Sequence, residues 1–188
     1  MMDKNLVNRL RNLATILLCL AIICSTSRGQ DFQWIQQFGG SENDGANCIK
    51  ADNKGNVFVL GDFSGQAWGN TLSLQGVGFL NVFLAKYDDS GALSWVKQVK
   101  SQGVIRSRGL TIDSDGNICI TGWIRDTTYF DTTMLVGPPK DSLYADYFIA
   151  RYNPGGDLLW AKQAVTTYSN LGNSVTADSG FADIWNHF

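Results

Sequence analysis

The chain has 188 residues, 44% hydrophobic and 17% charged, a balance that excludes a disordered chain and fits a folded domain. Its net charge is −2 and it has no basic stripe, which argues against nucleic acid or anionic membranes as partners. Glu42 is the only glutamate among 17 acidic residues. Because Glu is frequent on helix surfaces and Asp in turns, this composition predicts many turns and few helices, as in an all-β fold.

Residues 1–29 have the pattern of a secretory signal peptide. Basic residues precede an apolar run over 13–24, and small residues then predict cleavage before Gln30. The alternative is a lipoprotein anchored through Cys24. We therefore expect a secreted, periplasmic or cell-surface protein with no membrane insertion after signal removal.

The rest of the chain is an internal repeat. The motif Trp34-Ile-Gln-Gln returns at Trp95 and again at Trp160, at spacings of 61 and 65 residues. Two complete units each contain four strand-like runs separated by turn residues. We expect strands over 46–52, 56–63, 81–88 and 92–99 in the first unit, and over 107–113, 117–124, 146–153 and 157–164 in the second.

Repeated Asp and Gly residues mark the turns, and a second pair of glycines recurs inside a strand. Asp52 and Asp113 can hydrogen-bond to the turn backbone, and Gly55 and Gly116 supply positive φ. The structural repeat positions are Trp34, Trp95, Trp160, Asp52, Asp113, Gly55, Gly116, Gly61 and Gly122. Runs such as 57–60 are apolar at every position, which indicates strands buried on both faces. Stacked four-stranded antiparallel meanders, the blades of a β-propeller, bury such strands.

These motifs resemble the bacterial β-propeller repeat family of the SBBP type. The resemblance rests on Phe38-Gly-Gly-Ser, on Asp52-x-x-Gly-Asn-Val-Phe-Val-x-Gly, and on Val82-Phe-Leu-Ala-Lys. It implies a propeller fold and a surface or secreted location, and it brings no catalytic residues. The second unit departs from the pattern, with Lys100-Ser-Gln in place of the Gly-Gly pair.

The number of units predicts an incomplete ring. We expect a partial β-propeller over 30–188, made of a lone closing strand at 32–38, a blade at 46–99, a blade at 107–164 and a truncated blade at 171–188. A ring needs at least four blades. We therefore expect a truncated chain; assembly of several copies into a ring is the alternative.

Few residues are candidates for chemistry. Asp113, Asp115 and Asn117 resemble the start of a calcium loop, but no Glu follows at the twelfth position, so a hairpin turn without metal is expected. The only histidine is His187, which leaves triads and zinc sites without their usual residue. We expect no enzyme and no cofactor. Cys48 and Cys119 lie in apolar strand patterns, where buried thiols are expected and a disulfide is the alternative.

Aromatic residues offer the best candidates for binding. Trp34, Trp95 and Trp160 repeat and are expected to pack blades, with Trp95 buried. Five others are interpreted as non-repeating and as lying in long connections over 64–80 and 125–145, where loops on a rigid scaffold bind partners or cover blade edges. They are Trp68, Trp123, Tyr129, Phe130 and Tyr144.

The sequence thus predicts an exported, non-catalytic propeller module that binds an unknown protein or glycan or serves as a scaffold. The alternative is the propeller portion of a larger secreted, glycan-active enzyme whose catalytic part is absent from this chain.

Overall fold

The computed structural model describes residues 33–69, 73–165, 175–177 and 182–183. All regular structure in these ranges is β-strand in antiparallel sheets, which confirms the predicted all-β class there. The predicted signal segment, most of the predicted truncated blade, and His187 lie outside them. No described segment forms a helix long and apolar enough to cross a membrane.

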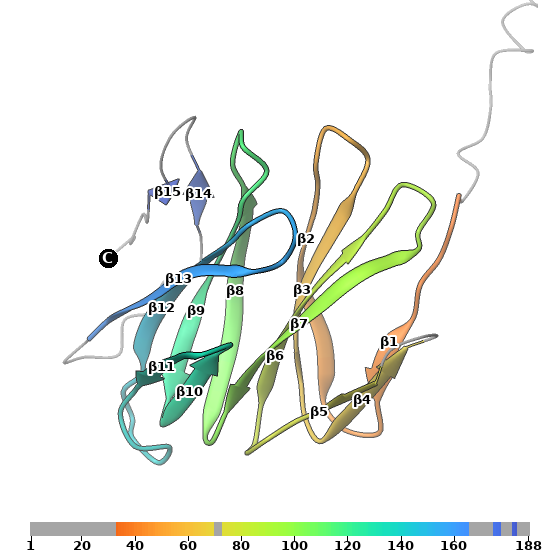
Figure 1. Ribbon diagram of the computed structural model, residues 1–188. Coiled ribbons are helices and arrows are strands. Elements are labelled where there is room, and N and C mark those ends of the chain that lie inside the picture. Colours follow the sequence, from red (N-terminus) through yellow and green to blue (C-terminus); the bar gives the residue numbers. More distant parts are fainter. Residues whose placement is uncertain (1–32, 70–72, 166–174, 178–181, 184–188) are drawn as a thin grey trace, which may run out of the picture. The chain divides into compact units, whose positions relative to one another are not determined.

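The first repeat folds as four antiparallel strands in the spatial order β7-β6-β3-β2 (Figure 1). The strands are β2 (Asp44–Ala51), β3 (Val57–Phe63), β6 (Asn81–Tyr87) and β7 (Leu93–Ser101). These bounds lie within two residues of the predicted runs. We call these four strands the first repeat sheet.

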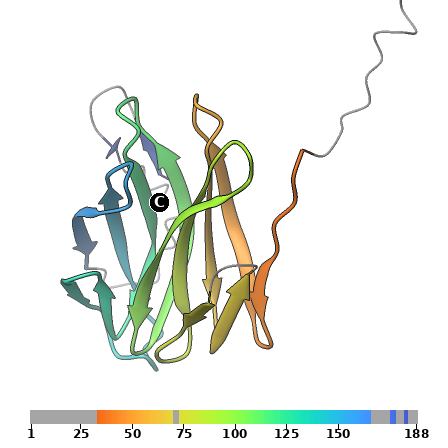
Figure 2. The same cartoon turned by 45° about the vertical axis from the view of Figure 1, so that its right-hand side comes forward.

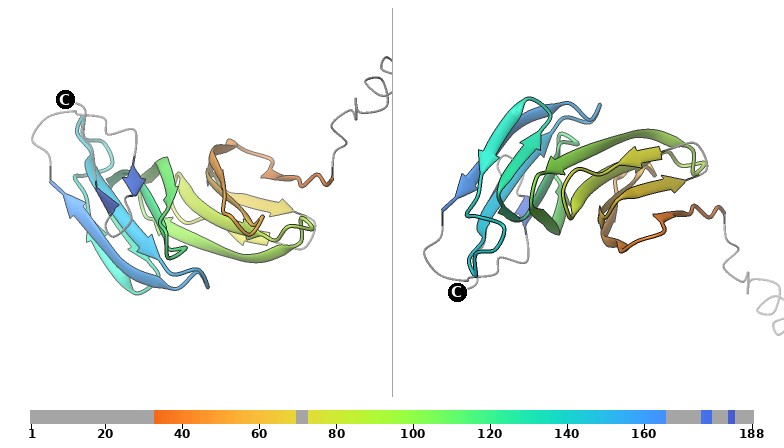
Figure 3. Two further views of the ribbon diagram at one scale, coloured as in Figure 1. Left: turned by 90° about the horizontal axis from the view of Figure 1, so that it is seen from above. Right: turned by 90° about the horizontal axis from the view of Figure 1, so that it is seen from below.

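The second repeat forms the same arrangement, in the order β13-β12-β9-β8. Its strands are β8 (Val104–Ile112), β9 (Ile118–Arg125), β12 (Asp146–Tyr152) and β13 (Leu158–Ala164). We call them the second repeat sheet. Figure 3 shows the two repeat sheets as neighbouring layers.

The two repeat sheets bury a shared apolar core between them, which explains why their central strands are apolar at every position. Strands β3 and β6 turn one face toward the second repeat sheet, and β2 lies beside β8. Core residues that are at most 4% exposed include Phe58, Leu60, Val82 and Leu84 from the first repeat, and Leu110, Ile118, Ile120 and Phe148 from the second.

A buried carboxylate also joins the repeats. Asp62 on β3 accepts hydrogen bonds from the backbone N–H and the hydroxyl of Ser107 on β8, at 2.9 and 2.7 Å. Both residues are buried. Hydrogen bonds to a charged group inside a protein favour one arrangement of the two sheets over others.

The repeated glycines have identifiable structural roles. Gly55 and Gly116 adopt φ of 83° and 82° in the β2–β3 and β8–β9 turns, where an L side chain would be strained. At Gly61 a Cβ would overlap the carbonyl oxygen of Gly45 and the ring of Phe83, so only Gly allows this close approach.

The long connections predicted over 64–80 and 125–145 are not irregular loops, and this part of the prediction is wrong. They contain the hairpin strands β4 (Gln66–Gly69) and β5 (Ser73–Gln75), and likewise β10 (Thr127–Phe130) and β11 (Thr133–Val136). We call these two pairs the clasp hairpins, and Figure 2 shows them in a second view.

Each clasp hairpin pairs with the last strand of the preceding repeat. Strand β4 pairs with β1 (Phe38–Gly40), and β10 pairs with β7. The described residues before Phe38 form no strand, so the strand predicted at 32–38 begins later and is paired instead of alone. The clasp hairpins therefore connect successive repeats by backbone hydrogen bonds.

The glutamine of the repeated Trp motif holds the other side of each clasp hairpin. Gln98 donates its side-chain N–H to the carbonyl of Gln75 at 2.7 Å. Gln163 does the same to the carbonyl of Val136 at 2.8 Å. Each hairpin is thus held by its own repeat as well as by the preceding one.

Trp34 and Trp95 pack on the next repeat, but Trp95 is only half-buried, contrary to the prediction. Trp95 donates its indole N–H to the carbonyl of Pro154 at 3.2 Å, and a Cβ at Gly156 would lie 3.0 Å from its ring. Trp34 covers Gly91 in the equivalent turn. The ring spans a junction between two repeats, so part of it stays at the surface.

The described strands do not close into a ring. After β13, the described residues include only the two-residue strands β14 (Thr176–Ala177) and β15 (Ala182–Asp183), which pair with each other. Val175, just before β14, packs close to Gly109 on β8.

Candidate functional site

The exposed aromatic candidates lie on the clasp hairpins. Trp68 on β4 is 49% exposed and Tyr129 on β10 is 36% exposed. Phe130, the next residue, is fully buried and packs on Phe148 with ring centroids 4.9 Å apart. Its prediction as a binding residue is therefore wrong: adjacent residues in a strand point to opposite faces, and the Phe130 face is the core.

Trp68 and Tyr129 occupy the same position in successive repeats, which corrects the interpretation that they do not repeat. In the first repeat Trp68 stands opposite Gly39 and Ser73 on the adjacent strands. In the second, Tyr129 stands opposite Lys100 and Met134. Because directly opposite residues of antiparallel strands share a face, each aromatic sits in the middle of a three-strand row.

We call these two rows, Gly39–Trp68–Ser73 and Lys100–Tyr129–Met134, the aromatic platforms. All three residues of the second are exposed, Met134 by 55%. Lys100 and Met134 were not predicted as binding residues from the sequence. A signal was available: Trp68 and Tyr129 are separated by 61 residues, the spacing of the Trp motif.

The platforms offer side chains that can make contacts with a partner. An exposed aromatic ring offers apolar area at a low entropy cost, and the indole or phenol adds a hydrogen bond. Lys100 beside Tyr129 adds a positive charge and Met134 an adaptable apolar side chain. Trp and Tyr are typical of the energetically important centres of protein interfaces.

Two further candidates are joined by an arginine that the sequence analysis did not predict. Trp123 lies within strand β9, so its predicted place in a long connection is wrong. It is half-buried, and the Arg125 guanidinium carbon lies 5.3 Å from the centroid of its ring. Arg125 also donates a hydrogen bond to the carbonyl of Tyr144 at 2.9 Å. Tyr144 is 41% exposed. These three residues form a second cluster, distinct from the platforms in composition.

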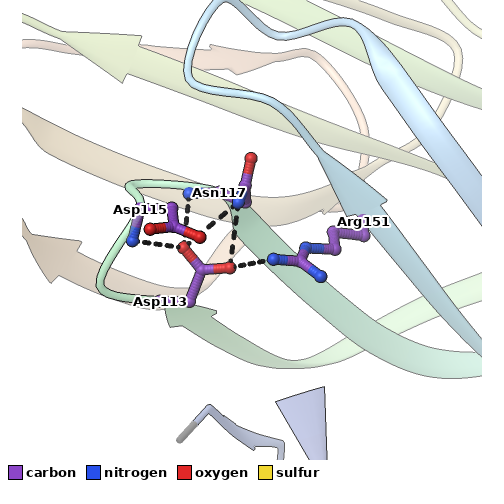
Figure 4. A network of polar contacts seen from close by, with 4 residues as sticks. All are labelled: Asp113, Asp115, Asn117 and Arg151. Carbon is purple, nitrogen blue, oxygen red and sulfur yellow. Dashed lines mark hydrogen bonds and ion pairs between the residues drawn. The ribbon is translucent and has the colours of Figure 1, made fainter. Parts of the chain in front are cut away.

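The predicted calcium-loop residues form a hydrogen-bonded turn (Figure 4). One carboxylate oxygen of Asp113 accepts backbone N–H groups from Asp115 and Asn117 at 3.0 and 2.8 Å. The other accepts from the side chains of Asn117 and Arg151. Bound donors and an adjacent guanidinium disfavour a cation at Asp113.

The charge state of Asp113 follows from the same contacts. Burial alone would raise its pKa, but the hydrogen bonds from Asn117 and the bond and charge of Arg151 together lower the pKa below its usual value. Asp52 has the equivalent turn bonds from Lys54 and Asn56, without a direct ion pair in the described structure. The described residues contain no group of three or more His, Cys, Asp or Glu able to hold a metal.

A cleft of about 430 Å³ separates the two turns. Its lining includes the apolar residues Phe58 and Ile112 and the charged residues Lys86 and Asp115. Three acidic and two basic side chains line this cleft in all: Asp52, Asp113, Asp115, Lys54 and Lys86.

Cys48 and Cys119 are free thiols, as the interpretation without a disulfide predicts. Cys119 is fully buried on β9, while Cys48 on β2 is only partly buried and donates to the carbonyl of Arg108 at 3.2 Å.

Comparison with known proteins shows a distant similarity to a repeat protein. No protein-family model matches the chain. The chain is 27% identical over 163 residues to an uncharacterised WD repeat-containing protein of Acanthamoeba polyphaga mimivirus, an alignment that covers 78% of this chain. It covers 11% of that protein, so the chain spans about a tenth of the length of this relative.

Proposed function

We propose that this chain is a repeat scaffold of the β-propeller type, related to the SBBP-type repeats, which binds protein partners through its aromatic platforms. The WD repeats named in its relative are four-stranded propeller blades, and the two repeat sheets have that strand count and antiparallel order. The single observation that carries the binding proposal is the exposed aromatic at the same position of both clasp hairpins, Trp68 and Tyr129.

Energetics favours a binding role for these two residues over a packing role. Strand pairing and the glutamine side chains already hold the hairpins in position. Neither exposed ring is therefore needed to keep its hairpin in place. A large exposed aromatic on a rigid strand contributes area to a complex with little loss of conformational entropy.

The test is binding by a variant that lacks both rings. Trp68→Ser with Tyr129→Ser should lose at least about tenfold in affinity for partners captured by the wild-type chain, because central aromatics dominate such interfaces. Leu159→Ser, which removes a side chain 50% exposed on β13, is the matched control and should bind normally. A glycan array tests the other ligand class: ring-dependent binding to sugars without protein capture would replace a protein partner with a glycan.

Export is part of the proposal, supported by the charged start and apolar run of residues 1–29. Mass spectrometry of the protein from its native host should find an N-terminus at Gln30 outside the cytoplasm. A lipid-modified Cys24 at the N-terminus would instead show a membrane-anchored lipoprotein.

A further inference from the structure

The outer edge of β13 differs from the edges of β1 and β7. In the two earlier cases a clasp hairpin of the next repeat covers the edge, with pairs Gly39–Trp68 and Lys100–Tyr129 at equivalent positions. Among the described residues, no strand pairs with the outer edge of β13, the equivalent strand of the second repeat.

Exposure supports this difference. Val99 at the end of β7 is 1% exposed and belongs to the same core cluster as Phe130 of the covering hairpin. The equivalent residue in the second repeat, Ala164, is exposed, and the following Val165 is 78% exposed. An apolar strand end that is buried in one repeat is thus accessible in the next.

Backbone N–H and C=O groups at the outer edge of β13 point away from β12, where an incoming strand could pair with them. Gln102, just after β7, donates its backbone N–H to the carbonyl of Thr127 at 2.8 Å. Alternate residues of a strand direct their N–H and C=O groups to the same side, so Lys100 also faces β10. Val165 is the equivalent of Lys100, and its N–H and C=O are therefore the groups that an incoming strand would bind.

We propose that the β13 edge binds an antiparallel strand from the clasp hairpin of another repeat of this type, with its aromatic opposite Val165. This interface is separate from the aromatic platforms and goes beyond the proposed function. The register follows the Lys100–Tyr129 pair, and an aromatic opposite a β-branched residue is a favourable cross-strand pair. Strand addition of this kind takes its affinity from main-chain hydrogen bonds.

The probe is a labelled peptide of residues 127–136, closed by a disulfide between cysteines added at its two ends. Closure keeps the hairpin formed, because an isolated two-stranded hairpin is marginally stable. Fluorescence anisotropy against the purified full chain should show saturable binding of one peptide per chain. The control peptide carries an N-methyl group at Tyr129, which removes the N–H directed at the edge and leaves the hairpin's own ladder intact.

N-methylation should weaken binding at least about tenfold, since the lost hydrogen bond leaves a buried acceptor unpaired. On the chain, Val165→Pro should weaken binding to the same extent, whereas Val165→Thr, which keeps the N–H, should bind like the wild type. Absence of saturable binding would overturn the proposal. So would equal affinity of the two peptides, a result that does not depend on any variant of the chain folding correctly.

Discussion

The two repeat sheets present the same face to different surroundings, and the difference shows what holds this fold together. Leu110 on β8 is 3% exposed because the first repeat sheet packs against it. Ile49, its equivalent on β2, is 67% exposed and borders an open apolar cleft of about 230 Å³ with Trp34 and Tyr87. Identical patterns therefore give a core position or a surface position, depending on whether a neighbouring sheet is present.

The largest expected effect tests this comparison directly. Leu110→Ala should lower the free energy of unfolding by about 2–5 kcal/mol, the range for buried Leu truncations. Ile49→Ala should change it by about 0.5 kcal/mol or less, as exposed substitutions do. Urea denaturation followed by tryptophan fluorescence measures both. Equal losses would mean that the Ile49 face is covered in solution.

The ion pair gives a second contrast between the repeats. Arg151→Met should destabilise by about 1–3 kcal/mol because it removes a charged partner from the largely buried Asp113. Lys86→Met, at the equivalent position of the first repeat, should cost about 0.5 kcal/mol or less, since Lys86 makes no described ion pair with Asp52.

The same pair sets a pH dependence with a defined sign. The pKa of Asp113 is lowered in the folded state, so its contribution is complete above the ordinary Asp pKa of about 3.9. It should be lost as the pH falls below that value, and Arg151→Met should reduce this loss. An identical acid unfolding curve for the variant would show that the pair contributes nothing.

The thiols of Cys48 and Cys119 should differ in their reactivity toward a thiol reagent. Burial raises the pKa of Cys119 to about 11, and partial burial also raises the pKa of the more exposed Cys48. A thiol reagent near pH 8 should label Cys48 in the native state and Cys119 only after unfolding.

Since the folded state requires the protonated Cys119, its contribution to stability should decrease as the pH rises from about 8.5 toward 11. Replacing Cys119 with Ala should remove this component. Native labelling of Cys119 would show that β9 is not covered.

The smallest effect is expected from calcium. Thermal unfolding with millimolar calcium and with a chelator should give the same midpoint, because the turn N–H groups and Arg151 already occupy the oxygens of Asp113. Asp113→Asn is the control for a rise in midpoint. A rise that this substitution abolishes would make Asp113, Asp115 and Asn117 cation ligands.

Local chemistry made much of the fold predictable from the sequence alone. An Asp followed by a Gly three residues later specifies a turn through local contacts alone. In this chain Asp52 accepts hydrogen bonds from the turn backbone and Gly55 adopts positive φ. The apolar runs and the 61- and 65-residue spacings similarly predicted the eight strands of the two repeat sheets to within three residues. The repeated Trp and Gln were visible as a motif, although their contacts were not.

Only the tertiary structure decided what the connections between the second and third strands do. Residues 66–75 and 127–136 share little sequence, so their common role as clasp hairpins depends on the edge that the preceding repeat offers for pairing. That pairing turns Phe130 into the core and leaves Tyr129 exposed, a choice set by strand register. Packing of the Trp95 ring on the β12–β13 turn likewise leaves it half-buried at a junction between repeats. Sequence determines which residues can pair and pack, but burial depends on neighbours brought together from distant parts of the chain.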